Sequence, residues 1–487
     1  MARTWRIGIR ACAIVGLAAV LETACAVGPN YKPPRVTVPD RWTGVPAAAG
    51  GEPSVATPGE TAVTEWWKAF NDSTLDRLIS EAVQANLGLQ QAQARILQAR
   101  AARVVAGSGR WPSVNATASN TTSGSTTGSS GGSDTGTRNL AQGGLDAAWE
   151  LDFFGGVRRG VEAATADVQA AVEDARDVTV TLTAEVALDY VTLRGLQQQL
   201  AIVQQNLVAQ QETAAITHKR QAVGFASSLD VANADAQVAT TRSQIPLLEM
   251  SAQQEIYALS VLLGKEPQAL VAELSPAGAI PPLPPLVPVG LPSELLLRRP
   301  DIRRAEAQVH AATAQIGVAK ADLFPKISLS GSAGAERIAQ GALAALAGTF
   351  WSVIPAVTQP LFNAGRLRAN VHAQEAVAQQ AVLAYRQTVL VALQDVESAL
   401  IAYQKDQQRR AALAEAVQST RTAVDLSRRL YTAGQAEFLN LLTAQRDLYA
   451  SEDALVQADR TIDTDLIALF KALGGGWNPS AQPGRQS

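Results

Sequence analysis

The sequence predicts an α+β membrane protein in which one helix-and-strand unit occurs twice. Three observations lead to this fold class. Landmark residues recur at a constant spacing, long stretches without proline carry the heptad pattern of coiled coils, and short stretches alternate apolar with acidic residues. Together they indicate long helices joined to a small amount of sheet.

Composition excludes several other classes of protein. The chain has 487 residues and a formal net charge of −3, which does not suit a protein that binds nucleic acid through bulk positive charge. Its two cysteines, Cys12 and Cys25, are too few for a disulfide framework or a four-ligand zinc site. Beyond residue 21 no uncharged apolar run approaches the roughly 20 residues of a membrane helix, which excludes a multi-span helical membrane protein.

The N-terminus, residues 1–24, is predicted to be an export signal. Three arginines precede residues 11–21, an apolar stretch with the length of a secretory signal core. The sequence Leu21-Glu22-Thr23-Ala24-Cys25 resembles a bacterial lipobox, although Glu22 stands where leucine is usual. We therefore expect Cys25 to become the acylated first residue, with a palmitate-type anchor, and ordinary cleavage at a small-residue site is the alternative. The proline-rich residues 25–65 are expected to form an extended, lipid-anchored segment.

The duplication is clearest at two glycine turns. Residues 223–230 parallel residues 433–440 at an offset of 210, and the same offset pairs Leu263-Gly264 with Leu473-Gly474. One such pairing could arise by chance, but a shared offset along the chain indicates an internal repeat.

The repeat sets the expected organisation of the chain. Between the halves, residues 267–292 contain eight prolines in 26 positions, so this linker is expected to be extended and not helical. The expected segments are a first repeat over 66–264, a linker over 265–292, a second repeat over 293–474 and a tail over 475–487.

Long helices are predicted beside the glycine turns. From Val157 to Gln221 there is no proline and one glycine, Gly195, so a single helix of about 95 Å is expected at the usual rise per residue. A helix this long does not fit inside a globular domain and is interpreted as a rod that spans a gap. Apolar residues stepping by three and four follow a coiled-coil seam at Leu193, Leu196, Leu200, Val203 and Leu207.

Four short segments are predicted as strands. In residues 145–153, apolar residues alternate with Asp146, Ala148, Glu150 and Asp152, the pattern of a strand with one lipid-facing and one wet face. The other candidates are residues 113–119, 326–330 and 350–359. The stretch from 113 to 138, in which 19 of 26 residues are Ser, Thr or Gly, is expected to join the first two strands as a mobile surface loop.

These strands raise the question of how many chains are needed. Four strands cannot close a barrel, and an open sheet edge is not tolerated in lipid, so several chains must share one barrel if the strands enter the membrane. Copies would give eight, twelve or sixteen strands, and the residues alone do not choose among them. A small soluble hairpin in each repeat is the alternative, although Trp111, Trp149 and Trp351 lie where a membrane interface would favour them.

The start of the second repeat resembles a family signature. Residues 290–303 read Gly-Leu-Pro-Ser-Glu-Leu-Leu-Leu-Arg-Arg-Pro-Asp-Ile-Arg, which is similar to the G-L-P-S-x-L-L-x-R-R-P-D-I-R motif of the TolC/OprM/NodT outer-membrane efflux lipoproteins. Residues 314–320, Phe324-Pro325, residues 27–31 and Trp66-Trp67 extend the similarity over nearly the whole mature chain.

The resemblance implies a fold and a function. It implies a homotrimer with a twelve-stranded β-barrel in the outer membrane, continued by a twelve-helix coiled-coil tunnel in the periplasm and an equatorial belt made by the linker. It implies a lipid-anchored exit duct of a tripartite efflux system that exports drugs or other small toxic compounds, a source of antibiotic resistance. The implied partners are a periplasmic membrane-fusion adaptor protein, an inner-membrane transporter of the RND type and outer-membrane lipid.

The resemblance also implies two sites. The helix-hairpin tips would contact the adaptor, through Val223, Gly224, Phe225 and Ala226 in the first repeat and Gly434, Gln435 and Ala436 in the second. The periplasmic gate would lie just after the second tip, at Leu439, Asn440 and Thr443, with Tyr431 at the place of a tyrosine that holds the closed state in some relatives. Neither Asn440 nor Thr443 is the carboxylate of those relatives, so the gate is expected to depend on apolar constriction at Leu439.

Other function classes are weighed against this one. An enzyme is disfavoured because the three histidines are scattered and no nucleophile–base constellation or phosphate-binding loop is present, and no cofactor or metal is expected. A coiled-coil structural lipoprotein that conducts nothing would not need the amphipathic strand at residues 145–153. A duct for a type I secretion pump shares the fold and is set aside only by the resemblance.

Overall fold

A computed structural model describes residues 26–43, 54–57, 64–129, 132–340 and 346–477. The chain forms two compact units, each assembled from segments far apart in sequence. The first unit comprises residues 1–35, 96–171 and 305–385, and the second comprises residues 36–95, 172–304 and 386–487. Among the described residues, no helix is both long and apolar enough to cross a membrane.

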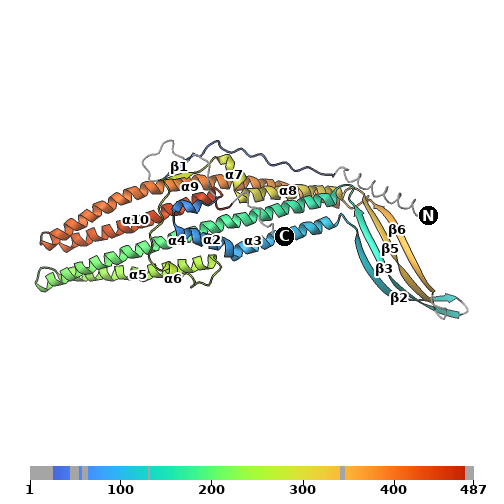
Figure 1. Cartoon of the computed structure of the whole chain (residues 1–487), viewed down its shortest axis with the longest axis horizontal. Coiled ribbons are helices and arrows are strands. Elements are labelled where there is room, and N and C mark those ends of the chain that lie inside the picture. The colour runs from blue at the N-terminus through green and yellow to red at the C-terminus, as the bar shows by residue number, and fades with distance from the viewer. Residues whose placement is uncertain (1–25, 44–53, 58–63, 130–131, 341–345, 478–487) are drawn as a thin grey trace. The chain divides into compact units, whose positions relative to one another are not determined.

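The first unit contains a four-stranded antiparallel sheet (Figure 1). Its strand order is β2-β3-β5-β6, so β2 and β6 are the two edges. The strands are β2 (Ser113–Ser129), β3 (Gly132–Leu151), β5 (Lys326–Gln340) and β6 (Leu346–Thr358). All four strand candidates therefore form strands, and the structure extends each at one end. Two of them stop short of the predicted end, β3 at Leu151 and β6 at Thr358. Pro355 lies within the edge strand β6, where a missing backbone N–H is best tolerated.

The predicted mobile loop over residues 113–138 is wrong. Apart from residues 130–131, which lie outside the described part of the chain, this stretch forms β2 and the start of β3, with register pairs from Ser113↔Ala148 to Ser129↔Gly132. The physical reason is that the backbone N–H and C=O groups of β2 that face β3 find ladder partners there, and threonine favours the pleated conformation. The amino-acid composition of this stretch reflects its small polar side chains, but it does not reveal that the backbone of β2 pairs with that of β3.

The register gives the sheet two chemically different faces. On one face, cross-strand rows such as Ala147–Gly331–Val353 and Leu145–Ala333–Trp351 are apolar. On the other face Ser332 and Ser352 bond to each other at 2.8 Å, and Thr117 donates to Asp146 at 2.6 Å. Phe350 and Ile354 of β6 are apolar exceptions on this second face.

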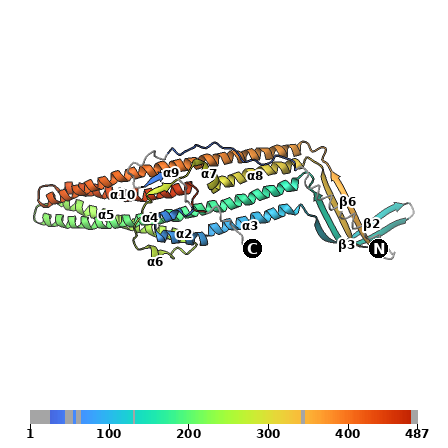
Figure 2. The ribbon, with the colours of Figure 1, turned by 45° about the horizontal axis from the view of Figure 1, so that its top comes forward.

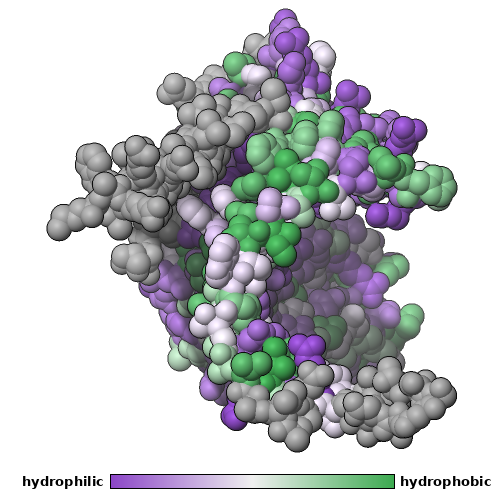
Figure 3. Space-filling model, turned by 90° about the vertical axis from the view of Figure 1, so that its right-hand side faces the viewer, coloured by the Kyte–Doolittle hydropathy of each residue, from purple (hydrophilic) through white to green (hydrophobic). Residues whose placement is uncertain are grey.

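The apolar face of the sheet is left uncovered by the residues that the structure describes. Its exposed side chains include Val114, Leu145, Trp351, Val353 and Val357. Figure 3 faces the strands of the first unit and shows hydrophobic residues beside weakly polar and hydrophilic ones. An exposed apolar sheet face of this kind marks a surface that contacts lipid or another chain.

Two long helix hairpins dominate the second unit. They are α4 (Gly156–Ala222) with α5 (Ser228–Leu262), and α9 (Arg366–Thr432) with α10 (Phe438–Ala472). In both Figure 1 and Figure 2 α5 lies alongside α4 and α10 alongside α9. The first helices are 67 residues long and the second 35, and corresponding helices begin 210 residues apart, which is the offset found in the sequence.

Shorter helices accompany the two long hairpins, and some of them contribute to a hydrophobic core. Helices α3 (Leu87–Ser108) and α8 (Pro300–Ala321) are a second matched pair of 22 residues each. The core of the second unit contains η1 (Trp66–Phe70), α2 (Ser73–Ala85) and α7 (Pro292–Arg298), packed against α4, α5, α9 and α10. Asp72 caps α2 by accepting from the amides of Thr74 and Leu75, and the Tyr190 hydroxyl donates to its second oxygen at 2.8 Å.

The linker is only partly extended, so the expectation that it contains no helix is wrong. It includes a short helix, α6 (Val271–Leu274), before β4 (Leu286–Pro288), which pairs in parallel with β1 (Val55–Thr57). The reason is local: residues 268–275 contain no proline, and α6 buries Leu274 in the core. The high proline content of the linker as a whole did not reveal that this short segment is free of proline and can form a helix.

Candidate functional site: the hairpin tips and the gate residues

Both helix hairpins reverse through the same glycine-capped turn. Gly224 follows the end of helix α4 and has φ +82°, and Gly434 follows the end of helix α9 and has φ +75°. At each tip the glycine N–H bonds back three residues and the following N–H bonds back five, as in Phe225 to Arg220 at 2.8 Å and Gln435 to Leu430 at 2.9 Å. This is the Schellman motif, which needs a residue that adopts positive φ without strain. The glycines are therefore explained by helix capping in the chain itself.

The first tip leaves apolar side chains exposed. Val223 and Phe225 are 66% and 75% exposed, while Ala226 is half-buried. The following helix α5 starts with a capping box, in which Ser227 and Asp230 bond to each other's backbone amide. The second tip has Gly434 and Gln435 exposed and Ala436 half-buried. The first tip is thus capped on both sides, and each tip presents a small surface that no described residue of its own unit covers.

The predicted gate residues do not all lie together. Leu439, Asn440 and Thr443 are exposed in the first turns of α10. Leu439 and Thr443 are four residues apart, so they occupy the same helix face. Tyr431 is different, because it is buried in a cluster with Ala214, Ala234, Phe438, Leu441 and Leu442. It holds the tip from inside and does not share the exposed surface of the other three.

The contacts of Tyr431 join the two hairpins. Its hydroxyl donates to the Thr217 hydroxyl on α4 at 3.2 Å, and its ring meets Phe438 edge-on at 5.6 Å. The Arg220 guanidinium lies 4.7 Å from the ring centroid and donates to the carbonyl of Tyr431 at 2.7 Å and that of Thr432 at 3.3 Å. A cation at the C-terminal carbonyls of α9 is favourable because that end carries partial negative charge.

The sequence pattern does not mark the α4 residues that contact Tyr431. Arg220 and Thr217 belong to the first repeat, more than 200 positions from Tyr431, and nothing in their local pattern marks them. The available signal was weak: a basic residue in the last turn of a helix beside a tip. Further polar bridges join the hairpins near the tips: Gln445 to Thr213 at 3.0 Å, Arg428 to Glu212 at 3.0 Å and Arg446 to Gln237 at 2.8 Å.

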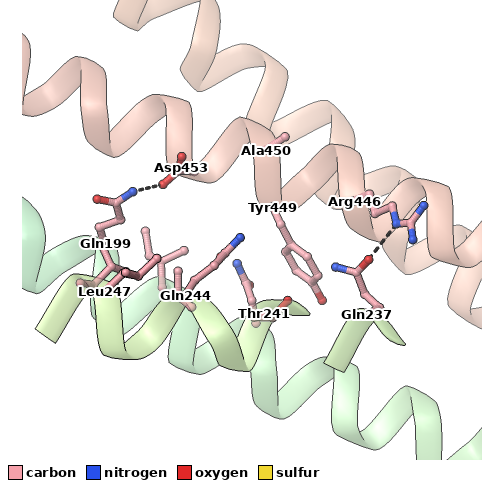
Figure 4. A pocket seen from close by; sticks show the side chains of 13 residues that line it. Gln199, Gln237, Thr241, Gln244, Leu247, Arg446, Tyr449, Ala450 and Asp453 are labelled. Atoms are coloured by element: carbon pink, nitrogen blue, oxygen red, sulfur yellow. Dashed lines mark hydrogen bonds between the residues drawn. The ribbon is translucent and has the colours of Figure 1, made fainter. Parts of the chain in front are cut away.

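A cavity of about 430 Å³ separates the tip cluster from the main core of the second unit. Figure 4 shows Tyr449 extending from α10 over Thr241 and Gln237 of α5. Burial raises the pKa of the Tyr449 hydroxyl to about 12, so it stays neutral. Polar bridges lie at both ends of the cavity, from Arg446 to Gln237 and from Gln199 to Asp453. The hairpins therefore touch at the tip and at the core, with a cavity between these two contacts.

Two other predicted features, Cys25 and the export signal, lie outside the described residues. Among the residues that the structure describes, no group of three or more His, Cys, Asp or Glu side chains is arranged to hold a metal ion.

The comparison with known families decides what this arrangement belongs to. The model of the outer membrane efflux protein family matches residues 78–265 and 291–475, once in each half of the chain. The chain belongs to the outer membrane efflux protein family. It is therefore an outer-membrane efflux channel that extends into the periplasm, in a family of channel proteins rather than enzymes.

Individual relatives match along almost the whole chain. Nodulation protein T of Rhizobium leguminosarum bv. trifolii is 33% identical over 470 residues, which are 96% of this chain and 97% of the relative. The solvent efflux pump outer membrane protein SrpC of Pseudomonas putida is 32% identical, over 94% of this chain and 96% of its own. The solved structure of the outer-membrane channel OprN superposes with a TM-score of 0.84 at 36% identity, covering 93% of this chain and all of that one.

Proposed function

We propose that three copies of this chain form the exit duct of a tripartite efflux system for drugs or other small toxic compounds. The observation that carries this proposal is the four-stranded sheet of the first unit, with one apolar exposed face and two open edges. An open edge in lipid leaves backbone groups without partners, so the edges β2 and β6 must pair with other copies. Three copies give a twelve-stranded barrel, continued by twelve helices.

The proposed organisation keeps the segments expected from the sequence. A signal over residues 1–24 is removed, and Cys25 carries acyl chains that anchor residues 25–65 to the outer membrane. The repeats over 66–264 and 293–474 supply helices and strands, the linker over 265–292 forms the equatorial belt and residues 475–487 are the tail. One acylated residue anchors stably only with further membrane contacts, which the barrel would provide.

The proposed gate is a ring of Leu439 side chains, one from each copy. Leu439 is 59% exposed within its own chain, although it is apolar, which supports a role in facing other copies across a pore. Asn440 and Thr443 add no fixed charge beside it. The gate therefore closes by an apolar constriction that expels water, and Tyr431 holds it through α4. The cavity behind the tip cluster gives the tip room to move without disturbing the core.

The proposed adaptor contact lies at the two capped tips. Val223 and Phe225 are exposed apolar side chains on a rigid turn, which is the surface that a partner hairpin can bury. On this proposal a periplasmic membrane-fusion adaptor binds there and connects the duct to an inner-membrane RND transporter. The relative SrpC is named as part of a solvent efflux pump, which supports a role in removing small apolar toxic compounds.

The two alternative functions differ in how well the structure suits them. A coiled-coil lipoprotein that conducts nothing does not need a sheet with an uncovered apolar face, so it is disfavoured. A type I secretion duct needs the same fold and differs in its partners. The name of SrpC favours the efflux assignment.

The gate proposal is tested by replacing Leu439 with serine. Leu439→Ser should admit vancomycin, which an intact outer membrane excludes, and make cells severalfold more sensitive, because a polar ring no longer excludes water. Leu229→Ser is the matched control: Leu229 holds the equivalent position in the first repeat and is 68% exposed, but lies outside the proposed gate. Unchanged sensitivity in Leu439→Ser, or an equal leak in both variants, would contradict the proposal.

A further inference from the structure

The segment that follows Cys25 lies against the first unit in an ordered way. We call residues 26–31 the strap. The Val27 N–H donates to the carbonyl of Phe154 at 3.1 Å, between the end of β3 and the start of α4. A Cβ atom on Gly155 would lie 2.7 Å from the Cα of Ala26, so the strap passes directly over this junction.

A buried arginine holds the middle of the strap. The Arg159 side chain of α4 is only 6% exposed. It donates to the carbonyl oxygens of Val27 at 3.3 Å and Gly28 at 3.5 Å, to the Asn30 side chain at 2.7 Å and to Glu162 at 2.7 Å. A buried charge needs several partners, and three of these four acceptors belong to the strap.

Two glycines let the strap approach helix α8. Gly28 has φ +98°, and a Cβ atom there would lie 2.6 Å from the Cα of Gly317. A Cβ atom on Gly317 would lie 2.7 Å from the Cγ of Arg159. The absence of a side chain at Gly28 therefore lets the strap approach α8, and its absence at Gly317 leaves room for the arginine that binds the strap.

The far end of the strap is held by an aromatic stack. The Tyr31 ring stacks on the His310 ring with centroids 4.2 Å apart, and the Tyr31 hydroxyl donates to Glu306 at 3.0 Å. His310 Nε2 lies 3.0 Å from the same Glu162 carboxylate that pairs with Arg159. Both ends of the strap thus connect to one network of side chains on α4 and α8.

We propose that Arg159, Gly317 and His310 form a binding groove for the strap that fixes the lipid anchor at the strand–helix junction. This inference rests on the proposed acylation of Cys25, which is joined to Ala26 by one peptide bond. A strap held in the groove brings the acyl chains and the apolar face of the sheet to the membrane together, and a free strap would let the anchor move independently of the strands. Arg159 is a positioning residue in this account.

The first test measures whether the strap is held. Hydrogen exchange of the Val27 amide is followed in the purified full-length protein. Gly317→Ala should accelerate it by about tenfold or more, because it displaces a charge-assisted hydrogen-bonding group. Gly160→Ala is the matched control, since a Cβ atom there meets nothing within 4 Å. Asn30→Ala, a milder change at an exposed residue, should act in the same direction. Unchanged exchange in both Gly317→Ala and Asn30→Ala would overturn the groove.

The second test measures whether holding the strap matters for the anchor. Arg159→Met should lower severalfold the fraction of acylated protein that becomes stable oligomer in the outer membrane, and Arg159→Lys should restore part of it. The same substitution is then made in a chain with Cys25→Ser behind a signal that is cleaved without acylation. There Arg159→Met should have no further effect, whereas an equal loss in both backgrounds would mean a merely structural role and overturn the inference. Absence of acyl label on the wild-type chain would instead contradict the proposed acylation, whatever the exchange data show.

Discussion

Arg220 is the residue through which the first repeat holds the second at the tips. Its guanidinium donates to the last carbonyls of α9 and lies over the Tyr431 ring. Hydrogen bonds to charged groups contribute about 1.5–3 kcal/mol, and a cation at a helix C-terminus adds up to about 1 kcal/mol at exposed sites. The free energy of these contacts is large enough to shift the proposed gate beside them between its open and closed states.

Replacing this arginine should therefore loosen the gate. Arg220→Met should raise vancomycin sensitivity in the same direction as Leu439→Ser, because α9 loses the arginine contacts that help to link it to α4. Lys219→Met removes the same charge from the adjacent exposed position and is the matched control. The measurement is vancomycin sensitivity at equal amounts of outer-membrane protein. If the two variants behaved alike, net charge at the tip would matter and the specific contact would not.

Asp463 is an unusual residue in the core of the second unit. Its side chain is 1% exposed, and among the described residues neither carboxyl oxygen has a hydrogen-bond partner. Burial, with a smaller contribution from the negative charge of Asp459, raises its pKa from 3.8 to about 8. The folded protein therefore keeps this proton at a pH at which the unfolded chain has released it.

This proton makes stability depend on pH in a defined direction. Because the folded-state pKa is raised, the contribution of Asp463 is fully present below pH 3.8 and is lost as the pH rises towards about 8. Asp463→Asn should therefore lose less thermal stability than the wild type between pH 5 and about 8. Asp447→Asn, at an exposed carboxyl of the same helix, should follow the wild-type curve. Parallel curves for all three proteins would show that Asp463 is not protonated in the folded state.

At the scale of the residue, local features of the chain could be predicted from the sequence, and contacts between segments far apart in sequence could not. The tip glycines could be predicted because a helix reversal needs positive φ at a fixed place. The partners of Tyr431 could not, since Thr217 and Arg220 are brought to it only by the packing of one hairpin on the other. The same applies to Arg159, whose strap partners are about 130 positions away.

At the scale of the element, the sheet carries the clearest chemical division. Alternate residues of β6 point to opposite faces, so Val353 lies on the apolar face and Ser352 on the face where it bonds to Ser332. A basic residue on a lipid-facing position costs about 2–4 kcal/mol at the membrane midplane, while a residue on the wet face costs little.

Two neighbouring substitutions separate the faces. Val353→Arg should sharply lower the amount of stable oligomer in the outer membrane, because it places a charge in lipid. Ser352→Arg should be tolerated, since it adds the same side chain on the wet face one residue away. The measurement is the fraction of protein that migrates as oligomer after mild extraction of outer membranes. Equal tolerance of both variants would mean that the apolar face is not lipid-facing.

The elements were predictable to different degrees for physical reasons. Helix α4 could be predicted because residues 157–221 contain no proline and follow a heptad pattern at residues 193–207, and α9 is its counterpart in the second repeat. Strand β2 was largely missed because its Ser, Thr and Gly residues give no hydrophobic alternation, and its order comes from backbone pairing with β3. Helix α6 was missed because average proline content does not describe a four-residue turn.

At the scale of the whole molecule, the single chain is incomplete in two respects. Its sheet has two unpaired edges, and its apolar sheet face has no covering layer among the described residues. Both deficits disappear if copies pair edge to edge in a membrane. The amphipathic strands predicted the need for several copies, but the number three came from the family resemblance, because any closed ring of copies satisfies the edges.

The most direct test of the account is the number of chains in the particle extracted from outer membranes with mild detergent. Light scattering, corrected for bound detergent, should give three mature chains, each lighter than the 51.1 kDa of the full sequence by the mass of residues 1–24. Negative-stain images should show a stalk of about 100 Å, as expected from the rise of a 67-residue helix. A monomer or a compact particle would contradict the shared barrel and with it the duct.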